Sequence, residues 1–149
     1  MNFSQKSRAI ALKALDLTIK NGGCTLDPKT NEEVTTGYAV GGIREFKFHG
    51  ASVGHIDEVT EAIAKIRVSH PKTKIGFWLD GSTLYVDAVA VMNSEESART
   101  VGEAFDELCI FHLDTKREIW LGDDGFDAMM NHAEEQEEII QQMTREAND

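Results

Sequence analysis

Asp87 is the residue of this sequence that most clearly raises a question of chemistry, because it interrupts the apolar stretch KIGFWLDGSTLYVDAV (residues 74–89). An acid inside an apolar strand can be a catalytic group, a ligand for a bound molecule, or one half of an ion pair. The dipeptide Asp80-Gly81 is typical of a two-residue hairpin turn. A turn at these two residues brings Lys74 directly across from Asp87, so we expect a cross-strand ion pair.

The same hairpin register predicts two different sheet faces. Alternate residues of a strand share a face, so the expected core face holds Ile75, Phe77, Leu84, Val86, Ala88 and Ala90. The opposite face holds Trp78, Tyr85, Val89 and Val91, with Tyr85 expected opposite Gly76. That second face is too apolar to be left in water. Either another element covers it or it binds a partner or ligand.

Other residues that could do chemistry form weaker patterns. His49 and His55 lie six residues apart around two glycines in FHGASVGH, but a metal or acid–base role would need a third group that the sequence does not name. The stretch GYAVGG lacks the spacing of a dinucleotide fingerprint and precedes no helix. Nucleophile-elbow, phosphate-loop and calcium-loop spacings are absent. We therefore predict no catalytic residue, no cofactor and no metal.

Length and composition favour one soluble domain. The chain has 149 residues, of which 41% are hydrophobic and 28% charged. No apolar run approaches the roughly 20 residues of a membrane helix, and Lys13 and Asp16 interrupt the N-terminal apolar pattern. Two distant cysteines, Cys24 and Cys109, are expected to be buried thiols. These features predict a cytoplasmic location and no contact with membranes.

The negative charge is concentrated near the C-terminus. The net charge is -11, and residues 123–149 hold nine acids and only one base, Arg145. The remaining residues are nearly balanced, so we do not expect direct binding of nucleic acid, which needs a basic patch. The acidic run predicts instead a surface for a basic partner, with the candidate residues Glu134, Glu135, Glu137 and Glu138.

Periodicity and turn residues predict an α+β fold. Four helices are expected at 4–20, 56–68, 93–108 and 126–147, the third capped by Asn93 with Glu96 and buried through Ala98, Val101, Phe105 and Leu108. Hairpins are expected in 74–91 and 109–121, and extended pieces in 24–48 around a turn at 27–31. The prediction is a single domain with an antiparallel sheet built from two hairpins: a body, residues 1–122, and a C-terminal acidic helix within 123–149.

The expected last helix carries a broken apolar stripe. Its members are Phe126, Met129, Met130, Ile140 and Met143. This stripe either covers the second sheet face of its own chain or forms an interface, and the latter predicts a homodimer or higher oligomer.

The order GGCTLDPKT, GYAVGG, GFWLDGSTLYVDAV and ARTVGEAFDEL, within residues 22–121, resembles small uncharacterised proteins of bacteriophages and mobile elements. The resemblance implies no activity, cofactor or catalytic residue, and it favours an accessory protein that acts by binding.

Two functions therefore remain open from the sequence. The first is a non-enzymatic acidic protein that binds and modulates a host protein with a basic surface, for example by local mimicry of nucleic acid. The second is a small-molecule (nucleotide-like) binding protein or a small enzyme with a pocket beside Trp78, Tyr85 and Asp87, and with His49 and His55 as further candidates.

Overall fold

The computed structural model describes residues 1–50 and 55–122. The described elements, in chain order, are α1 (Phe3–Asn21), β1 (Gly23–Asp27), β2 (Glu32–Glu33), β3 (Tyr38–His49), α2 (Ile56–Ser69), β4 (Lys74–Asp80), β5 (Thr83–Met92), α3 (Glu95–Ala104), β6 (Cys109–His112) and β7 (Arg117–Trp120). The predicted α+β class is confirmed. The expected fourth helix, with its stripe Phe126, Met129, Met130, Ile140 and Met143, lies outside the described residues.

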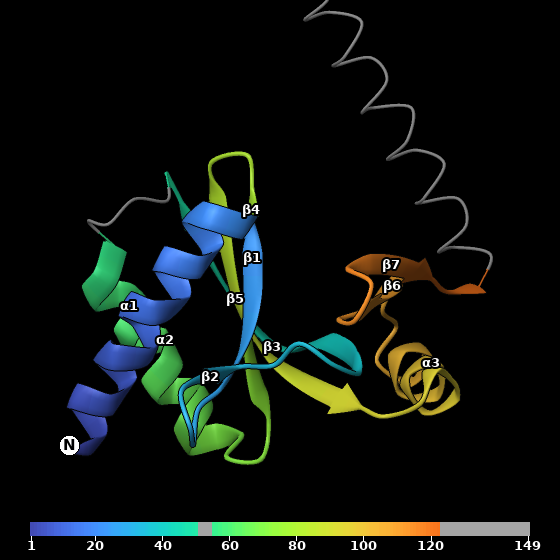
Figure 1. The fold of residues 1–149 in the computed structure, drawn as a ribbon, viewed down its shortest axis with the longest axis horizontal. Coiled ribbons are helices and arrows are strands. Elements are labelled where there is room, and N and C mark those ends of the chain that lie inside the picture. Colours follow the sequence, from blue (N-terminus) through green and yellow to red (C-terminus); the bar gives the residue numbers. More distant parts are fainter. Residues whose placement is uncertain (51–54, 123–149) are drawn as a thin grey trace, which may run out of the picture.

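All seven described strands belong to one antiparallel sheet with the order β2-β1-β4-β5-β3-β6-β7. The two predicted hairpins are present as β4-β5 and β6-β7, but they are not neighbours, because β3 lies between them. Figure 1 shows the consequence: α1 and α2 lie beside one half of the sheet, and α3 lies with β6 and β7 at the other end. The long strands β3 and β5 connect the two halves.

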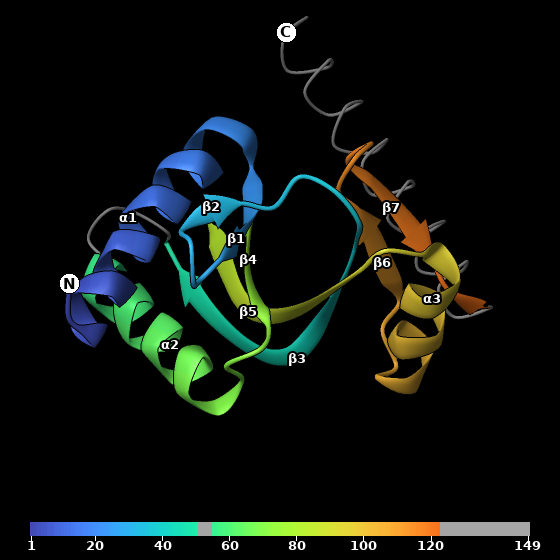
Figure 2. The ribbon, with the colours of Figure 1, turned by 60° about the horizontal axis from the view of Figure 1, so that its bottom comes forward.

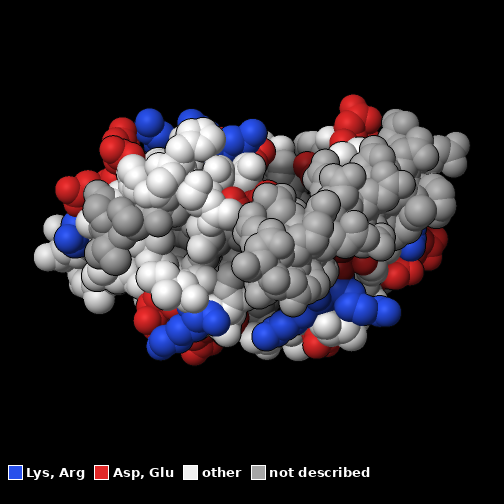
Figure 3. Space-filling view, turned by 90° about the horizontal axis from the view of Figure 1, so that it is seen from above, with Lys and Arg blue, Asp and Glu red and all other residues white. Residues whose placement is uncertain are grey.

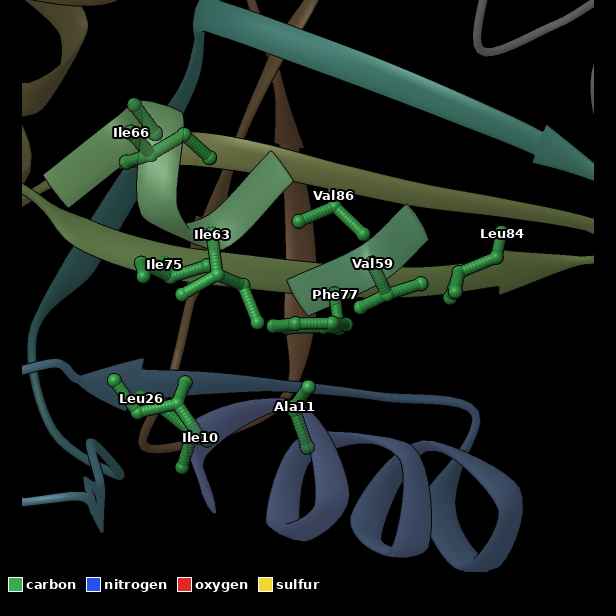
Figure 4. Close-up of a cluster of buried hydrophobic side chains, with 12 residues drawn as sticks. Ile10, Ala11, Leu26, Val59, Ile63, Ile66, Ile75, Phe77, Leu84 and Val86 are labelled. Carbon is green, nitrogen blue, oxygen red and sulfur yellow. The ribbon is translucent and has the colours of Figure 1, made fainter. Parts of the chain in front are cut away.

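The larger half is held by α1 and α2 on one sheet face. Asn2 caps α1 by accepting the backbone N–H of Gln5, and Gly22 ends the helix with a left-handed φ of 86°. Figure 4 shows the core between these helices and strands β1, β4 and β5; its labelled residues are Ile10, Ala11, Leu26, Val59, Ile63, Ile66, Ile75, Phe77, Leu84 and Val86. The predicted core face of the β4-β5 hairpin is therefore confirmed.

The smaller half packs α3 on the same sheet face through Ala98 and Gly102, the two buried residues of that helix. Ala98 packs with Val40, Ile110 and Leu121 in a second core cluster. A Cβ on Gly102 would come within 2.7 Å of the Leu121 side chain and 3.0 Å of Ile110. The absence of a side chain at Gly102 therefore sets how closely α3 approaches the β6-β7 hairpin.

The sheet bends where β3 changes register against β5, between Val40 and Arg44. Extra residues on one strand of an antiparallel pair form a β-bulge, which bends the sheet and increases its twist. Figure 2 shows the resulting curvature, with the segment between β2 and β3 arching over the concave side. This segment is fixed at its far end, because Gly37 donates its N–H to Asp114 (2.8 Å) and accepts the N–H of Leu113 (2.9 Å).

Two details of α3 differ from the prediction. Ser94 rather than Asn93 is the N-cap, since its hydroxyl accepts the N–H of Ser97. The helix ends at Ala104, and Phe105 and Leu108 are 51% and 46% exposed instead of continuing the buried stripe. Asp106 has a φ of 55°, a left-handed conformation that turns the chain out of the helix.

Across residues 1–50 and 55–122, the structure has no helix with the length and hydropathy that a membrane crossing requires.

We predict that Gly102→Ala destabilises the protein by about 1–3 kcal/mol, because the added methyl group overpacks the contact with Leu121 and Ile110. Glu103→Ala changes the next residue, which is exposed, and is the matched control with almost no expected effect. Urea denaturation of the two variants measures the difference. Equal stability of G102A and the parent protein would contradict the close packing of α3.

Candidate functional site

The expected ion pair between Asp87 and Lys74 is not formed, so this prediction was wrong. Asp80 pairs with Thr83 across the hairpin, which shifts every cross-strand partner by two residues from the predicted register. Asp87 therefore lies opposite Gly76, while Lys74 forms its ion pair with Asp27 at 3.0 Å. Tyr85, predicted opposite Gly76, lies opposite Trp78.

Asp87 lines a pocket of about 680 Å³ on the concave side of the bent sheet. All three sequence-predicted binding residues of the body, Trp78, Tyr85 and Asp87, line this one pocket. Six of the described lining residues are acidic (Glu33, Glu45, Asp80, Asp87, Glu107 and Glu118) and one, Lys116, is basic. The described part of the chain provides no ion-pair partner for any of the six acids.

Glycines make the space for the Asp87 carboxylate. A Cβ on Gly41 would lie 2.5 Å from Asp87 Oδ2, and a Cβ on Gly76 would lie 2.7 Å from Oδ1. The backbone N–H of Gly42 donates to Oδ2 at 3.2 Å. Because any side chain at Gly41 or Gly76 would displace the carboxylate, both strands beside β5 are shaped around it.

Two further acids face the same place. Glu45 of β3 lies directly opposite Asp87 in the sheet, and like charges at such positions destabilise the pairing. Glu107 follows the left-handed turn after α3, and its carboxylate fills the space that a side chain on Gly42 would need. The bulge at Gly41-Gly42 therefore has one carboxylate on each side, Asp87 from the sheet and Glu107 from the end of α3.

This environment holds the proton of Asp87 tightly. Burial raises the pKa of Asp87 to about 7; the N–H of Gly42 opposes this effect, and the charges of Glu45 and Glu107 add to it. Burial also raises the pKa of Glu107, with a further contribution from the charge of Glu45. Near neutral pH, the pocket therefore exchanges a proton between Asp87 and solvent.

Aromatic side chains form one wall of the pocket. Trp78 and Tyr85 are cross-strand neighbours, and Trp78 is 49% exposed. The Lys47 ammonium lies 5.6 Å from the centre of the Tyr85 ring, a cation–π contact. By contrast, Val89 is only 4% exposed and packs with Ala39 and Leu113, so part of the face predicted to need a cover is covered by its own sheet.

The two thiols line the pocket but are held protonated, and the two candidate histidines lie away from it. Cys24 and Cys109 are free, partly buried and line the pocket, and burial raises their pKa values to about 12 and about 11. His49 hydrogen-bonds Thr83 at 3.1 Å, whereas His55 contacts Glu58 at 3.1 Å, and neither lines the pocket. In the described part of the chain, no group of three His, Cys, Asp or Glu side chains could hold a metal ion.

Figure 3 shows Lys and Arg side chains on both long edges of the view from above, interspersed with acids. The candidate residues Glu134, Glu135, Glu137 and Glu138 lie outside the described residues.

Sequence reasoning did not identify Glu45, Glu107 or the bulge. The paired glycines of GYAVGG within an extended stretch were a signal for the bulge, but nothing local marked Glu107.

Comparisons with protein-family models, curated proteins and solved structures give no match to this chain. The function is therefore argued from the chemistry of the pocket.

We predict that Asp87→Asn stabilises the protein above pH 7. A carboxyl whose pKa is higher in the folded state binds more protons when folded, so its contribution to stability falls as pH rises from about 4 through 7. Moving the pKa from 3.8 to about 7 corresponds to about 4 kcal/mol at full ionisation, the upper limit of the gain at pH 8.

Denaturation at pH 4, 6 and 8 measures this effect. We expect D87N and the parent protein to differ little at pH 4, and the difference to grow steadily toward pH 8. A D87N variant that is less stable than the parent at pH 8 would show that the Asp87 charge is compensated within the fold.

Proposed function

We propose that this protein is a non-enzymatic binding protein whose concave pocket receives a positively charged part of a partner protein. The observation that carries the proposal is the pocket itself: about 680 Å³ in volume, with aromatic residues on one wall and six acids against one base in its described lining. Such a lining favours a cation and disfavours a polyanion such as a nucleotide.

The electrostatics of the pocket support a ligand-binding rather than a structural role for its acids. Structural acids are normally neutralised by a nearby base, as Asp27 is by Lys74. Asp87 and Glu45 instead face each other across the sheet, with no ion-pair partner among the described residues. A bound cation would relieve this repulsion, so part of its binding free energy would come from strain already present in the free protein.

The resemblance to proteins of bacteriophages and mobile elements supports a role in modulating a host protein. A partner with a basic surface would be attracted by the whole molecule, whose net charge is -11. The acidic run from Glu134 to Glu138 would add to this attraction, including by local mimicry of nucleic acid.

Selection of peptides from a random library at pH 8 tests the proposal. We expect strong enrichment of Lys and Arg on the parent protein, and loss of this enrichment on the double variant Glu45→Gln/Asp87→Asn. Glu96→Gln/Glu103→Gln is the matched control, because it removes two exposed acids of α3 that do not line the pocket. Enrichment without a bias toward basic residues, or identical peptides from all three proteins, would contradict the proposal.

A second candidate function is a small enzyme, favoured by the Asp87 carboxyl. A carboxyl group with a pKa of about 7 in a pocket has the proton affinity of a general acid or base at neutral pH. The other groups that would complete a covalent mechanism are weak here, because burial keeps Cys24 and Cys109 protonated.

We further propose that the protein forms a homodimer. Two large apolar side chains, Phe105 and Leu108, are each about half exposed, and a self-complementary interface would bury them. Repulsion between the two acidic C-terminal segments opposes dimerisation and is reduced by salt.

Light scattering at low and at high ionic strength tests the dimer. We expect twice the chain mass of 16.5 kDa, more completely at high salt. A monomer mass at micromolar concentration under both conditions would exclude the dimer.

A further inference from the structure

We infer that the cation received by the concave pocket is the guanidinium group of an arginine side chain on the partner, stacked on the Trp78–Tyr85 wall and hydrogen-bonded to the Asp87 carboxylate. This inference rests on the proposed function and adds the chemical identity of the bound group. It is carried by the shape of the pocket, the positions of its carboxylates and its exposed aromatic surface.

The Asp87 carboxylate has acceptor capacity left for a ligand with more than one donor. Asp87 accepts one hydrogen bond, from Gly42, and no other partner among the described residues uses the rest of its acceptor capacity. Glu107 lies on the other side of the same Gly41-Gly42 bulge. A guanidinium group presents five N–H donors in a fixed planar fork, so one arginine can offer two donors to the Asp87 carboxylate, whereas a lysine ammonium is a single point of charge.

The aromatic wall adds a second preference for arginine. Trp78 is half exposed, whereas the Tyr85 ring already has the Lys47 ammonium 5.6 Å from its centre, so Trp78 is the ring available for stacking. A guanidinium group stacks on such rings and is more weakly hydrated than an ammonium group, so it loses less on entering a partly buried pocket.

The acids of the pocket argue against an occupant from the same chain. Residues 123–149 contain nine acids and a single base, Arg145. Such a segment would meet six acids in the pocket lining, and the repulsion favours an arginine from another protein.

The inference includes a defined dependence on pH. The charged groups that face Asp87 are Glu45 from β3 and Glu107 after α3. The other titratable groups of the lining are Glu33, Asp80, Tyr85, Glu118, Lys116, Cys24 and Cys109. Arginine stays protonated throughout, so Asp87 must release its proton when the guanidinium group binds. With a pKa of about 7, ionisation of Asp87 rises about 30-fold between pH 5.5 and 8, and affinity should rise by the same factor.

The test uses the full chain and three capped peptides that differ at one position, flanked by Gly and Ser: arginine, lysine or the uncharged isostere citrulline. Binding is followed through the NMR signal of the Trp78 indole N–H, assigned with Trp78→Phe. We expect the lysine peptide to bind about tenfold and the citrulline peptide about 100-fold more weakly than the arginine peptide, as for loss of charge-assisted hydrogen bonds.

Variants of the protein complete the test. Asp87→Asn should weaken arginine binding about 10- to 100-fold and abolish its pH dependence, while the matched control Glu96→Gln/Glu103→Gln should change neither. Trp78→Ala removes the indole signal, so its binding is followed by isothermal titration calorimetry; it should weaken binding about 3- to 10-fold at every pH.

The outcomes separate this inference from the proposed function. Equal binding of the arginine and lysine peptides, both stronger than citrulline, would overturn the inference and leave the cation-binding function standing. If neither the arginine nor the lysine peptide binds, both the inference and the proposed function are overturned. If an Arg145→Gln variant binds the arginine peptide much more strongly than the parent protein does, Arg145 of the same chain competes for the pocket. This outcome would overturn the assignment of the arginine to a partner protein.

Discussion

The pairing of β3 with β5 is the interaction on which the rest of this structure depends. These two strands run through both halves of the sheet, and the core clusters beneath α1, α2 and α3 all include residues from them. A straight pair of this length would give an open, nearly flat sheet. The change of register at Gly41-Gly42 bends the pair instead, and the bend both turns the α3 half toward the larger half and creates the concave pocket.

The same bulge ties the fold to the chemistry of the pocket. Gly42 has a φ of 78°, its N–H contacts Asp87, and its missing side chain leaves space for Glu107. A residue with a side chain at this position would disturb the backbone, the carboxylate of Asp87 and the carboxylate of Glu107 together. Stability alone does not explain why the sheet is built around an acid with a raised pKa, since a neutral residue at position 87 would cost less. Such an arrangement is typical of a functional site.

The sequence predicted this architecture well where local patterns control structure. Helix α1 was expected over 4–20 and spans Phe3–Asn21, and α2 was expected over 56–68 and spans Ile56–Ser69. The predicted faces of the β4-β5 hairpin are also confirmed, although the register was wrong. Because strand side chains alternate with a period of two, a shift of two residues leaves every residue on its predicted face and changes only its partner.

The parts of the site that sequence reasoning missed depend on contacts between distant segments. Placing the turn at Asp80-Gly81 gave Asp87 a lysine partner, whereas the turn residues are Gly81 and Ser82. The apolar spacing of Phe105 and Leu108 favoured continuation of α3, and the left-handed residue Asp106 ends that pattern and directs Glu107 to the bulge. No local pattern reports that Glu45, Asp87 and Glu107 converge, because they come from β3, β5 and the end of α3.

The pKa values across the pocket favour the proposed binding function over catalysis. A covalent or acid–base mechanism needs at least one group ready to react and a second group to assist it. The thiols of Cys24 and Cys109 are held protonated, and the groups nearest Asp87 are acids rather than the base or nucleophile that would use its proton. The carboxylates of Glu45, Asp87 and Glu107 repel one another, and a bound cation would reduce this repulsion. This arrangement therefore supports the proposed affinity for positive charge, with the proton of Asp87 as the competing occupant.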